Sequence, residues 1–495
     1  MNPRMLGAAI LGGVLAALLG CAGQRPGRAG LDRIEHIVVI YAENRSFDHL
    51  YGLFPGADGI ANATPDQYTQ VDYDGKPLPH LPPVWKGKEP DPAFPKDLPN
   101  KPFRLDAPPI NIPLSGHMRD LIHKFYPQQE QINGGRNNRF VEVSDAGALA
   151  MGYYDGSTLP LWKWAQEYVL ADRFFMGAFG DSYLNHSWLI CACTPQDAGP
   201  ANLRAQVDER GWLKRRADSP ASALLGPASF VPGEFTTDGY SLTNNQPPYQ
   251  PSRVAPAPGG DPRFADPSKP ILPPQTQKTI GDTLSAKGIS WAWYAGAWNA
   301  AVRDGMQPAA AKRMIIANSE PGAPYFVTHH QPFNYFARFA PGTPDREKHF
   351  KDYTDLVAAI DKGELPAVAF HKPQGTLNQH PGFYADVLSG DIHLAGLIER
   401  IKASPLWATT AIIVTYDENG GFWDHVPPPK GDRWGPGTRI PAIIVSPLAK
   451  RGYVDHTSYD TTSIIKFITR RFDLEPLPGV RAAAGDLTNA FNFGN

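Results

Sequence analysis

Six short apolar runs, rich in β-branched and aromatic residues, recur along the chain and give the strongest indication of its fold. They are residues 37–41, 168–175, 289–294, 367–371, 411–416 and 440–446. Runs of this length that do not alternate with polar residues are typical of parallel strands covered on both faces. The pattern therefore predicts a largely parallel sheet at the centre of the molecule.

Two segments with helical periodicity follow strand candidates. In residues 391–402, Asp391 is placed to cap the first turn. The apolar stripe of this segment consists of Leu394, Leu397, Ile398 and Ile401. Residues 460–472 have the same pattern, with Asp460 or Thr461 as the cap. Strands that alternate with helices predict an α/β fold.

Acidic residues directly follow two of the strand candidates, where burial is costly for a charge. Glu43 and Asn44 follow the first run, and Asp417 and Glu418 follow the fifth. Ligands of such sheets bind beyond the carboxyl ends of the strands. Four oxygen-bearing side chains at that edge predict a site for a divalent cation, which would relieve the repulsion between the two adjacent acids. The alternative for "DENGG" is a solvated turn.

A third polar cluster follows the run 168–175. It contains Gly177, Gly180, Asp181, Ser182, Asn185 and His186. A serine at a glycine-flanked turn before a helix has an exposed hydroxyl near backbone N–H groups that can hold an anion. Taken alone, Ser182 is explained as well by a helix cap. A divalent cation held at the neighbouring strand ends would lower the pKa of its hydroxyl and make it a nucleophile.

The first thirty residues predict an export signal. Residues 6–19 are apolar but short for a membrane-spanning helix, which needs roughly 20 residues. Cys21, in "LLGCAG", lies where a bacterial lipoprotein signal carries its lipidated cysteine; the alternative is a plain secretory signal cut near Ala22. We expect residues 1–21 to be a lipoprotein-type signal and 22–32 a linker. The protein would be periplasmic, anchored to the outer membrane, or secreted.

The charge and the cysteine content of the chain limit which binding partners and which stabilising bonds we expect. The chain has 47 Lys and Arg against 49 Asp and Glu, and no basic block. It therefore gives no electrostatic reason to expect nucleic acid or an anionic membrane surface as a partner. Cys191 and Cys193 are one residue apart, poorly placed to bond to each other and too few for a zinc site. We expect two buried thiols.

Proline-rich tracts interrupt the α/β pattern. The 51 prolines of the chain concentrate in residues 76–113 and 246–274. Such tracts favour extended or polyproline conformations and indicate long surface excursions. We expect one catalytic domain, residues 33–495, with insertions near 76–113 and 203–275.

Several of these segments together resemble one known family. The blocks are "HIVVIYAENRSFDHLYG", "FYPQQEQINGGRNNRFV", "MGYYDGSTLPLWKWAQEYVLADRFFMGAFGDSYLNH", "NQHPG" and "IIVTYDENGGFWDHVPPP". They are similar to the bacterial phosphoesterase family of acid phosphatases and non-specific phospholipases C, which is related in fold to alkaline phosphatases and sulfatases. The resemblance spans nearly the whole mature chain. It implies a three-layer α/β/α sandwich of the alkaline-phosphatase type.

The resemblance also implies roles for individual residues. Ser182 would be the nucleophile that forms a phosphoserine. Glu43, Asn44, Asp417 and Glu418 would hold one divalent metal ion of unknown identity together with the Ser182 oxygen, and Asn44 would also face the phosphoryl group. These are the residues that the strand-end pattern had already singled out as a cation site.

The family blocks assign histidines to the same site. His123 and His380 would donate to the phosphoryl oxygens, and His330, or His329 beside it, would lie near the leaving group. Weaker candidates for substrate binding are Tyr154 and His425. Asp455 and His456 would orient the site from its periphery, or simply form the turn at a helix start.

We therefore expect a metal-dependent acid phosphatase that hydrolyses small phosphate monoesters, with histidines favouring mildly acidic conditions. The alternative within the family is a phospholipase C acting on phospholipids. Its longer members have further domains and often a twin-arginine signal, and neither is recognised here. An alternative of another class is an exported, non-catalytic binding lipoprotein. Membrane contact would come only from a lipid anchor on Cys21.

Overall fold

An eight-stranded sheet forms the centre of the protein in a computed structural model that describes residues 30–316, 323–382 and 384–494. In spatial order its strands are β13 (Tyr453–Asp455), β6 (Val169–Ala171), β12 (Ala442–Val445), β11 (Thr410–Tyr416), β1 (His36–Ala42), β10 (Val368–Lys372), β8 (Trp291–Ala295) and β9 (Phe350–Asp352). Only β12 runs antiparallel to both of its neighbours. The predicted, largely parallel sheet is confirmed.

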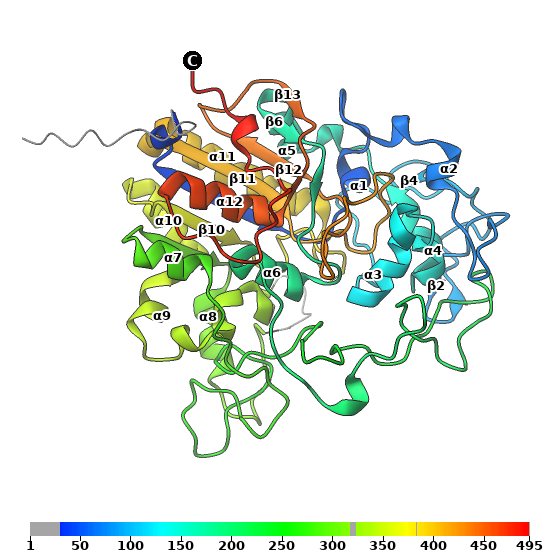
Figure 1. Cartoon of the computed structure of the whole chain (residues 1–495), viewed down its shortest axis with the longest axis horizontal. Coiled ribbons are helices and arrows are strands. Elements are labelled where there is room, and N and C mark those ends of the chain that lie inside the picture. The colour runs from blue at the N-terminus through cyan, green and yellow to red at the C-terminus, as the bar shows by residue number, and fades with distance from the viewer. Residues whose placement is uncertain (1–29, 317–322, 383, 495) are drawn as a thin grey trace, which may run out of the picture.

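Helices cover both sides of this sheet (Figure 1). The helices of the described residues are α1 (Phe47–Tyr51), α2 (Pro65–Tyr68), α3 (Phe125–Ile132), α4 (Phe140–Val143), α5 (Pro160–Glu167), α6 (Ser182–Cys191), α7 (Ile280–Ala286), α8 (Trp298–Gly305), α9 (Pro344–His349), α10 (Tyr353–Lys362), α11 (Val387–Lys402) and α12 (Thr461–Phe472). Of these, α2, α3 and α4 lie to the side of the sheet. Helix α11 packs against α5, and α12 packs against α6. The molecule is thus the expected α/β/α arrangement.

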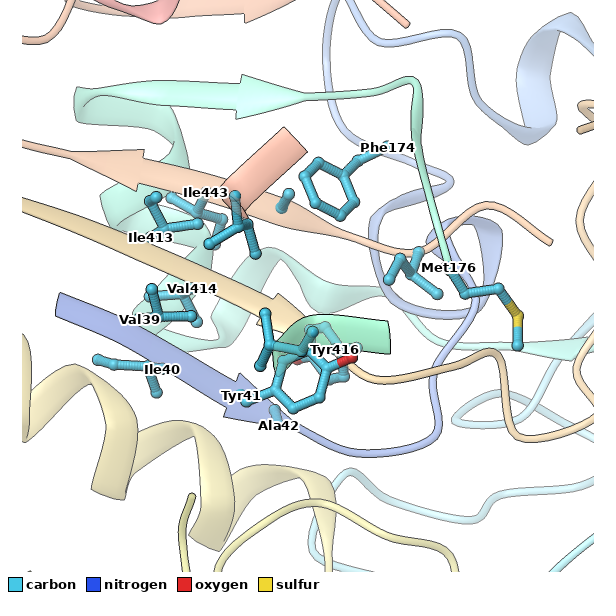
Figure 2. Close-up of a cluster of buried hydrophobic side chains, with 14 of the residues drawn as sticks. Val39, Ile40, Tyr41, Ala42, Phe174, Met176, Ile413, Val414, Tyr416 and Ile443 are labelled. Carbon is cyan, nitrogen blue, oxygen red and sulfur yellow. The ribbon is translucent and has the colours of Figure 1, made fainter. Parts of the chain in front are cut away.

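The core lies between the sheet and these helices, and it explains why the strands are so apolar. Val39 and Ile40 of β1 pack beside Val414 of β11 (Figure 2). All residues of β11, β12, β10 and β8 are buried. Because each buried aliphatic side chain contributes about 1.5–3 kcal/mol, this layer fixes the positions of the strand ends.

Two sequence expectations about element boundaries are corrected. The run 168–175 is not one strand: β6 ends at Ala171, and β7 (Phe174–Phe175) pairs with β14 (Tyr459–Asp460) outside the main sheet. The charged pair Asp172–Arg173 breaks the run, since Asp172 accepts the Asp58 N–H at 2.8 Å.

The cap of α11 is the second boundary that differs. This helix starts at Val387, and Asp386 caps it by accepting the Ser389 N–H at 2.7 Å. Asp391 lies one turn inside the helix and accepts the N–H of Leu161 at 2.7 Å instead, so it joins α11 to α5. For α12 the expectation is confirmed, because Asp460 caps it through the Thr462 N–H.

The expectation of two free thiols is wrong. Cys191 and Cys193 form a disulfide, with their Cα atoms 5.1 Å apart. The physical reason is the end of α6: Ala192 lies between them in the left-handed conformation, with φ of 47°. That conformation reverses the chain direction and brings the two side chains together, which the spacing alone did not indicate.

The proline-rich tracts are mainly irregular and lie away from the sheet. Residues 76–113 contain only the short strands β2 (Trp85–Lys86), β3 (Glu89–Pro90) and β4 (Phe103–Arg104), the last paired with β5 (Gly152–Tyr153). Among the described residues, no helix is long and apolar enough to cross a membrane. The predicted signal with Cys21 falls outside the described residues and stays a prediction.

Candidate active site

The register of the two central strands brings the predicted acids together. Ala42 of β1 lies opposite Tyr416 of β11, as Figure 2 shows, so the next residues of both strands leave the sheet side by side. Asn44 adopts a left-handed conformation, with φ of 59°. This turns its backbone N–H toward the Asp417 Oδ1, which accepts it at 3.0 Å. Two segments 373 residues apart therefore form one edge of the site.

The third segment reaches the same place through the start of α6. Gly180 has a φ of 102°, and a Cβ there would lie 2.9 Å from the Phe125 nitrogen, so only glycine fits this turn. Asp181 caps α6, and Ser182 is its first residue. The Ser182 hydroxyl donates to the Asn44 Oδ1 at 3.3 Å. The three distant segments therefore meet, as predicted, while the metal site that they would form stays a prediction.

Histidines from later in the chain surround Glu43. His330 Nε2 lies 2.5 Å from Glu43 Oε1, and His380 Nε2 lies 3.8 Å from Glu43 Oε2. The ring of His329 is buried beside that of His330, with centroids 5.1 Å apart. Both residues of the "HHQPF" pair thus belong to the site, and both are neutral at pH 7 because burial lowers their pKa values, that of His330 to about 4.

The other predicted histidine approaches from the opposite side. His123 Nε2 lies 3.4 Å from Asn44 Nδ2 and 3.7 Å from Glu418 Oε1. Burial alone would lower the pKa of His123, but the attraction of Glu418 and Asp120 outweighs it and raises the pKa to about 10. Glu418 and Asp120 therefore favour the protonated form of His123 at the edge of the site.

A buried lysine completes the surroundings of Glu43 and was missed by the sequence reasoning. Lys372 is the last residue of β10 and is fully buried, with Nζ 2.7 Å from Glu43 Oε1. Its ammonium also donates to the Ala42 carbonyl at 3.3 Å. A lysine in a buried strand was the signal that could have identified it.

Charge is unevenly distributed over the three carboxylates. Burial would raise the pKa of Glu43, but Lys372 and His330 hold it well below its usual value. For Asp417, burial and the charge of Glu43 outweigh the opposing effect of Lys372 and raise the pKa to about 6. Burial likewise raises the pKa of Glu418 well above its usual value. Two acids at this edge thus lack a sufficient counter-charge from the protein.

The unpaired oxygens fit a metal ion. Asp417 Oδ2 and Glu418 Oε1 are buried and have no hydrogen-bond partner among the described residues. Ligand-type atoms of Glu43, His186 and Asp417 lie within 4.8 Å of one another, and so do those of Glu43, His329 and His330. Carboxylate oxygens with imidazole nitrogens suit several divalent cations. His186 is a candidate ligand that the predicted set did not contain.

A cavity of about 600 Å³ opens onto this site. Asp181 and His123, which are among the more buried lining residues, lie in its depth, and Arg119, Asp120, Lys124 and Thr243 lie nearer its rim. Thr243 comes from the insertion 203–275, so that insertion forms part of the entrance. A second, largely apolar groove of about 300 Å³ adjoins the rim. It shares Ile122, Lys124 and Thr243 with the cavity and is lined further by Phe125, Leu213, Phe230 and Leu242.

The weaker candidates have other contacts. Tyr154 is fully buried, and its hydroxyl lies 3.1 Å from Met118 Sδ. Asp455 accepts the Tyr459 hydroxyl at 2.8 Å, and His456 is largely exposed and contacts Asp172. The structure therefore gives these residues packing and turn contacts, and their functional roles remain predictions.

His425 belongs to a buried charge network. Its Nδ1 lies 2.6 Å from Asp48 Oδ2, and its Nε2 lies 3.2 Å from Asp58 Oδ1. Arg439 binds the same Asp48 at 3.0 Å and also Asp424 at 3.0 Å. Because Arg439 and His425 both pair with these acids, we interpret the cluster as structural.

The network predicts a pH-dependent stability. Burial lowers the pKa of His425, but Asp48 raises it to about 9 overall. The pKa of His425 is thus higher in the folded protein than its unfolded value of about 6.5, so protonated His425 stabilises the fold. This stabilisation is fully present below about pH 6.5 and is lost as the pH rises through about 9. The stability difference between wild type and His425→Gln should therefore shrink by about 2–3 kcal/mol between about pH 6 and pH 10. Urea unfolding of both proteins at the two pH values measures it, and a pH-independent difference contradicts this interpretation.

Comparison with known proteins agrees with this geometry. Phospholipase C A of Mycobacterium tuberculosis (strain H37Rv) is 26% identical over 509 residues, which cover 95% of this chain and 79% of that protein. Non-hemolytic phospholipase C of Burkholderia pseudomallei is 25% identical, over 93% of this chain and 59% of that longer protein.

Solved structures and family models complete the comparison. A protein in the alkaline phosphatase superfamily from Vibrio parahaemolyticus matches with a TM-score of 0.34 and 11% identity, over 78% of this chain and 75% of that one. The model of the Phosphoesterase family matches residues 34–475, which contain every site residue described above. The chain belongs to the Phosphoesterase family.

Proposed function

We propose that this protein is a metal-dependent phosphatase that hydrolyses phosphate monoesters through a phosphoserine at Ser182. The observation that carries the proposal is the contact between the Ser182 hydroxyl and Asn44, whose backbone binds Asp417. A serine with no partner but water would be a weak nucleophile. Here it lies at the start of a helix and against a cluster of buried acids, which supports a nucleophilic role.

The chain's own residues account for two displacement steps. Ser182 Oγ loses its proton to water and attacks phosphorus in line, the bond from phosphorus to the ester oxygen breaks, and the alcohol leaves with a proton from His380. Water then attacks the phosphorus of the phosphoserine, the bond from phosphorus to Ser182 Oγ breaks, inorganic phosphate leaves, and Ser182 Oγ and His380 each regain a proton. Protonated His123 and the α6 N-terminus are placed to bind the phosphoryl anion throughout.

One divalent cation is part of the proposal. Bound by Asp417, Glu418 and the neighbouring oxygens, it would lower the pKa of the Ser182 hydroxyl and stabilise the charge on the transferring phosphoryl group. We expect thorough chelation to lower phosphatase activity at least about a hundredfold and a re-added divalent ion to restore it. Assays with Mg²⁺, Ca²⁺, Mn²⁺ and Zn²⁺ would identify the ion. Full activity in a chain shown by elemental analysis to be metal-free would exclude this role.

A phospholipase C activity is the second candidate, because a specific feature favours it. The apolar groove beside the rim, with Phe125, Leu213 and Phe230, is suited to an aliphatic substituent next to the phosphoryl site. The relatives that cover most of the chain are named phospholipases C. Both candidates share the chemistry at Ser182 and differ in whether the substrate phosphate carries one ester or two.

Rates on matched substrates separate the two candidates. We expect kcat/KM on p-nitrophenyl phosphate to exceed that on p-nitrophenylphosphorylcholine by at least about tenfold if the monoesterase proposal is correct. Phosphatidylcholine vesicles provide the natural diester. Faster release of phosphorylcholine than of phosphate would replace the first candidate with the second. An inactive Ser182→Ala variant serves as the blank for both assays.

A further inference from the structure

A second cavity, of about 520 Å³, lies away from the phosphoesterase site. It opens beyond the carboxyl ends of β8, β9 and β10, between the start of α10 and the middle of α11. Successive residues of a strand point to opposite faces of a sheet. Lys372 contacts Glu43 on one face, whereas the preceding residue, His371, packs its ring against Tyr353 and His393. The two sites are therefore on opposite sides of β10.

His371 is a buried hydrogen-bond acceptor that no described residue uses. It is fully buried, lines the cavity, and its Nδ1 lies 3.1 Å from the Tyr294 carbonyl. A carbonyl can only accept, so Nδ1 carries the proton and Nε2 presents a lone pair. Nε2 has no hydrogen-bond partner among the described residues. Burial, with the charge of His393 as a smaller cause, lowers the pKa of His371 to about 3, so the ring stays neutral.

The other lining residues indicate which charge a ligand of this cavity would carry. Arg303 lies at the cavity mouth, and no ion pair or hydrogen bond joins its guanidinium to another described residue. Asp352, the only acid among the described residues that line the cavity, already accepts the N–H groups of Asn299 and Thr354. The cavity thus offers one unpaired positive charge at its mouth and a bare acceptor in its depth. Tyr353 adds an aromatic ring beside that acceptor.

We propose that this cavity binds a small hydroxylated carboxylate, with its carboxylate on Arg303 and a hydroxyl donating to His371 Nε2. A single cation matches a monoanion better than a phosphate dianion. A buried acceptor without a donor costs about 1–3 kcal/mol, and a sugar-acid hydroxyl removes that cost. A volume of this size is within the usual range for small-molecule sites. The inference does not depend on the function proposed for Ser182.

Isothermal titration calorimetry of the full chain with D-gluconate tests the proposal. We expect saturable binding at one site, weakened about tenfold by Arg303→Gln and also by His371→Asn. Asn keeps a donor near the Nδ1 position and lacks the Nε2 acceptor. Ser182→Ala should leave the affinity unchanged, and sorbitol, which has the same carbon skeleton without the charge, should bind at least about tenfold more weakly.

Four results would overturn the proposal. The first is that the wild-type chain does not bind gluconate saturably, and the second is that Arg303→Gln binds it as tightly as wild type. The third is that Arg303→Gln weakens binding but His371→Asn does not. The fourth is that Ser182→Ala loses binding. The third would place gluconate on the surface, and the last would place it in the phosphoesterase site. If His371→Asn does not fold, gluconate density in a crystal of the wild-type chain decides whether its hydroxyls reach Nε2.

Discussion

Replacing Ser182 with alanine should lower kcat/KM on p-nitrophenyl phosphate by at least about a thousandfold without unfolding the protein. The substitution removes only the hydroxyl, which donates to Asn44 Oδ1 at 3.3 Å. Asp181, not Ser182, caps α6, so the helix start is kept. Steady-state kinetics together with a thermal unfolding curve separates loss of chemistry from loss of structure.

Ser187 provides the matched control for this experiment. It lies on the same helix, is buried, and its hydroxyl donates to the Tyr183 carbonyl at 3.2 Å. Ser187→Ala should keep kcat/KM within about threefold of wild type, because it removes a similar hydroxyl that has no contact with the site. If Ser182→Ala retains activity close to that of Ser187→Ala, the hydrolysis does not use Ser182.

Replacing Lys372 with methionine should destabilise the metal-free protein by about 3–5 kcal/mol. Methionine has a similar length and fills the space, so the main loss is the charge that faces Glu43 at 2.7 Å. Glu43 is only 1% exposed, and water cannot replace the ammonium. The change in the free energy of unfolding is measured by urea denaturation in the presence of a chelator.

A double variant shows whether loss of the ion pair between Lys372 and Glu43 causes this destabilisation. Replacing Glu43 with glutamine as well removes the stranded charge, so the double variant should recover more than about 1 kcal/mol relative to the sum of the two single changes. A cost below about 1 kcal/mol for Lys372→Met, or strict additivity, would mean that Glu43 does not depend on Lys372 for its charge.

The sequence was sufficient to predict which segments meet at the candidate site, because the signals lie within short segments of the chain. Buried parallel strands are recognisable as short apolar runs, and their carboxyl ends meet at one edge of the sheet. Glu43 and Asp417 each follow such a run, so their meeting required only that β1 and β11 be neighbours. The position of Ser182 followed from the glycine-flanked turn before α6, whose geometry Gly180 alone permits.

The features that the sequence did not indicate depend on side-chain directions. Lys372 ends a strand that was correctly predicted, but only the face toward which it points makes it the partner of Glu43. His371, one residue earlier, faces another cavity for the same reason. The disulfide depends on one left-handed residue, Ala192, and a left-handed alanine has no sequence signature.

The most direct test of the central claim is to identify the phosphorylated residue during turnover. The chain is mixed with p-nitrophenyl phosphate in the presence of its metal, quenched in acid within a turnover, digested and analysed by mass spectrometry. We predict phosphate on the peptide that contains Ser182 and none in the Ser182→Ala variant. Phosphate on a histidine or another serine, or net inversion at phosphorus when a phosphate monoester made chiral by oxygen isotopes is hydrolysed, would contradict the account.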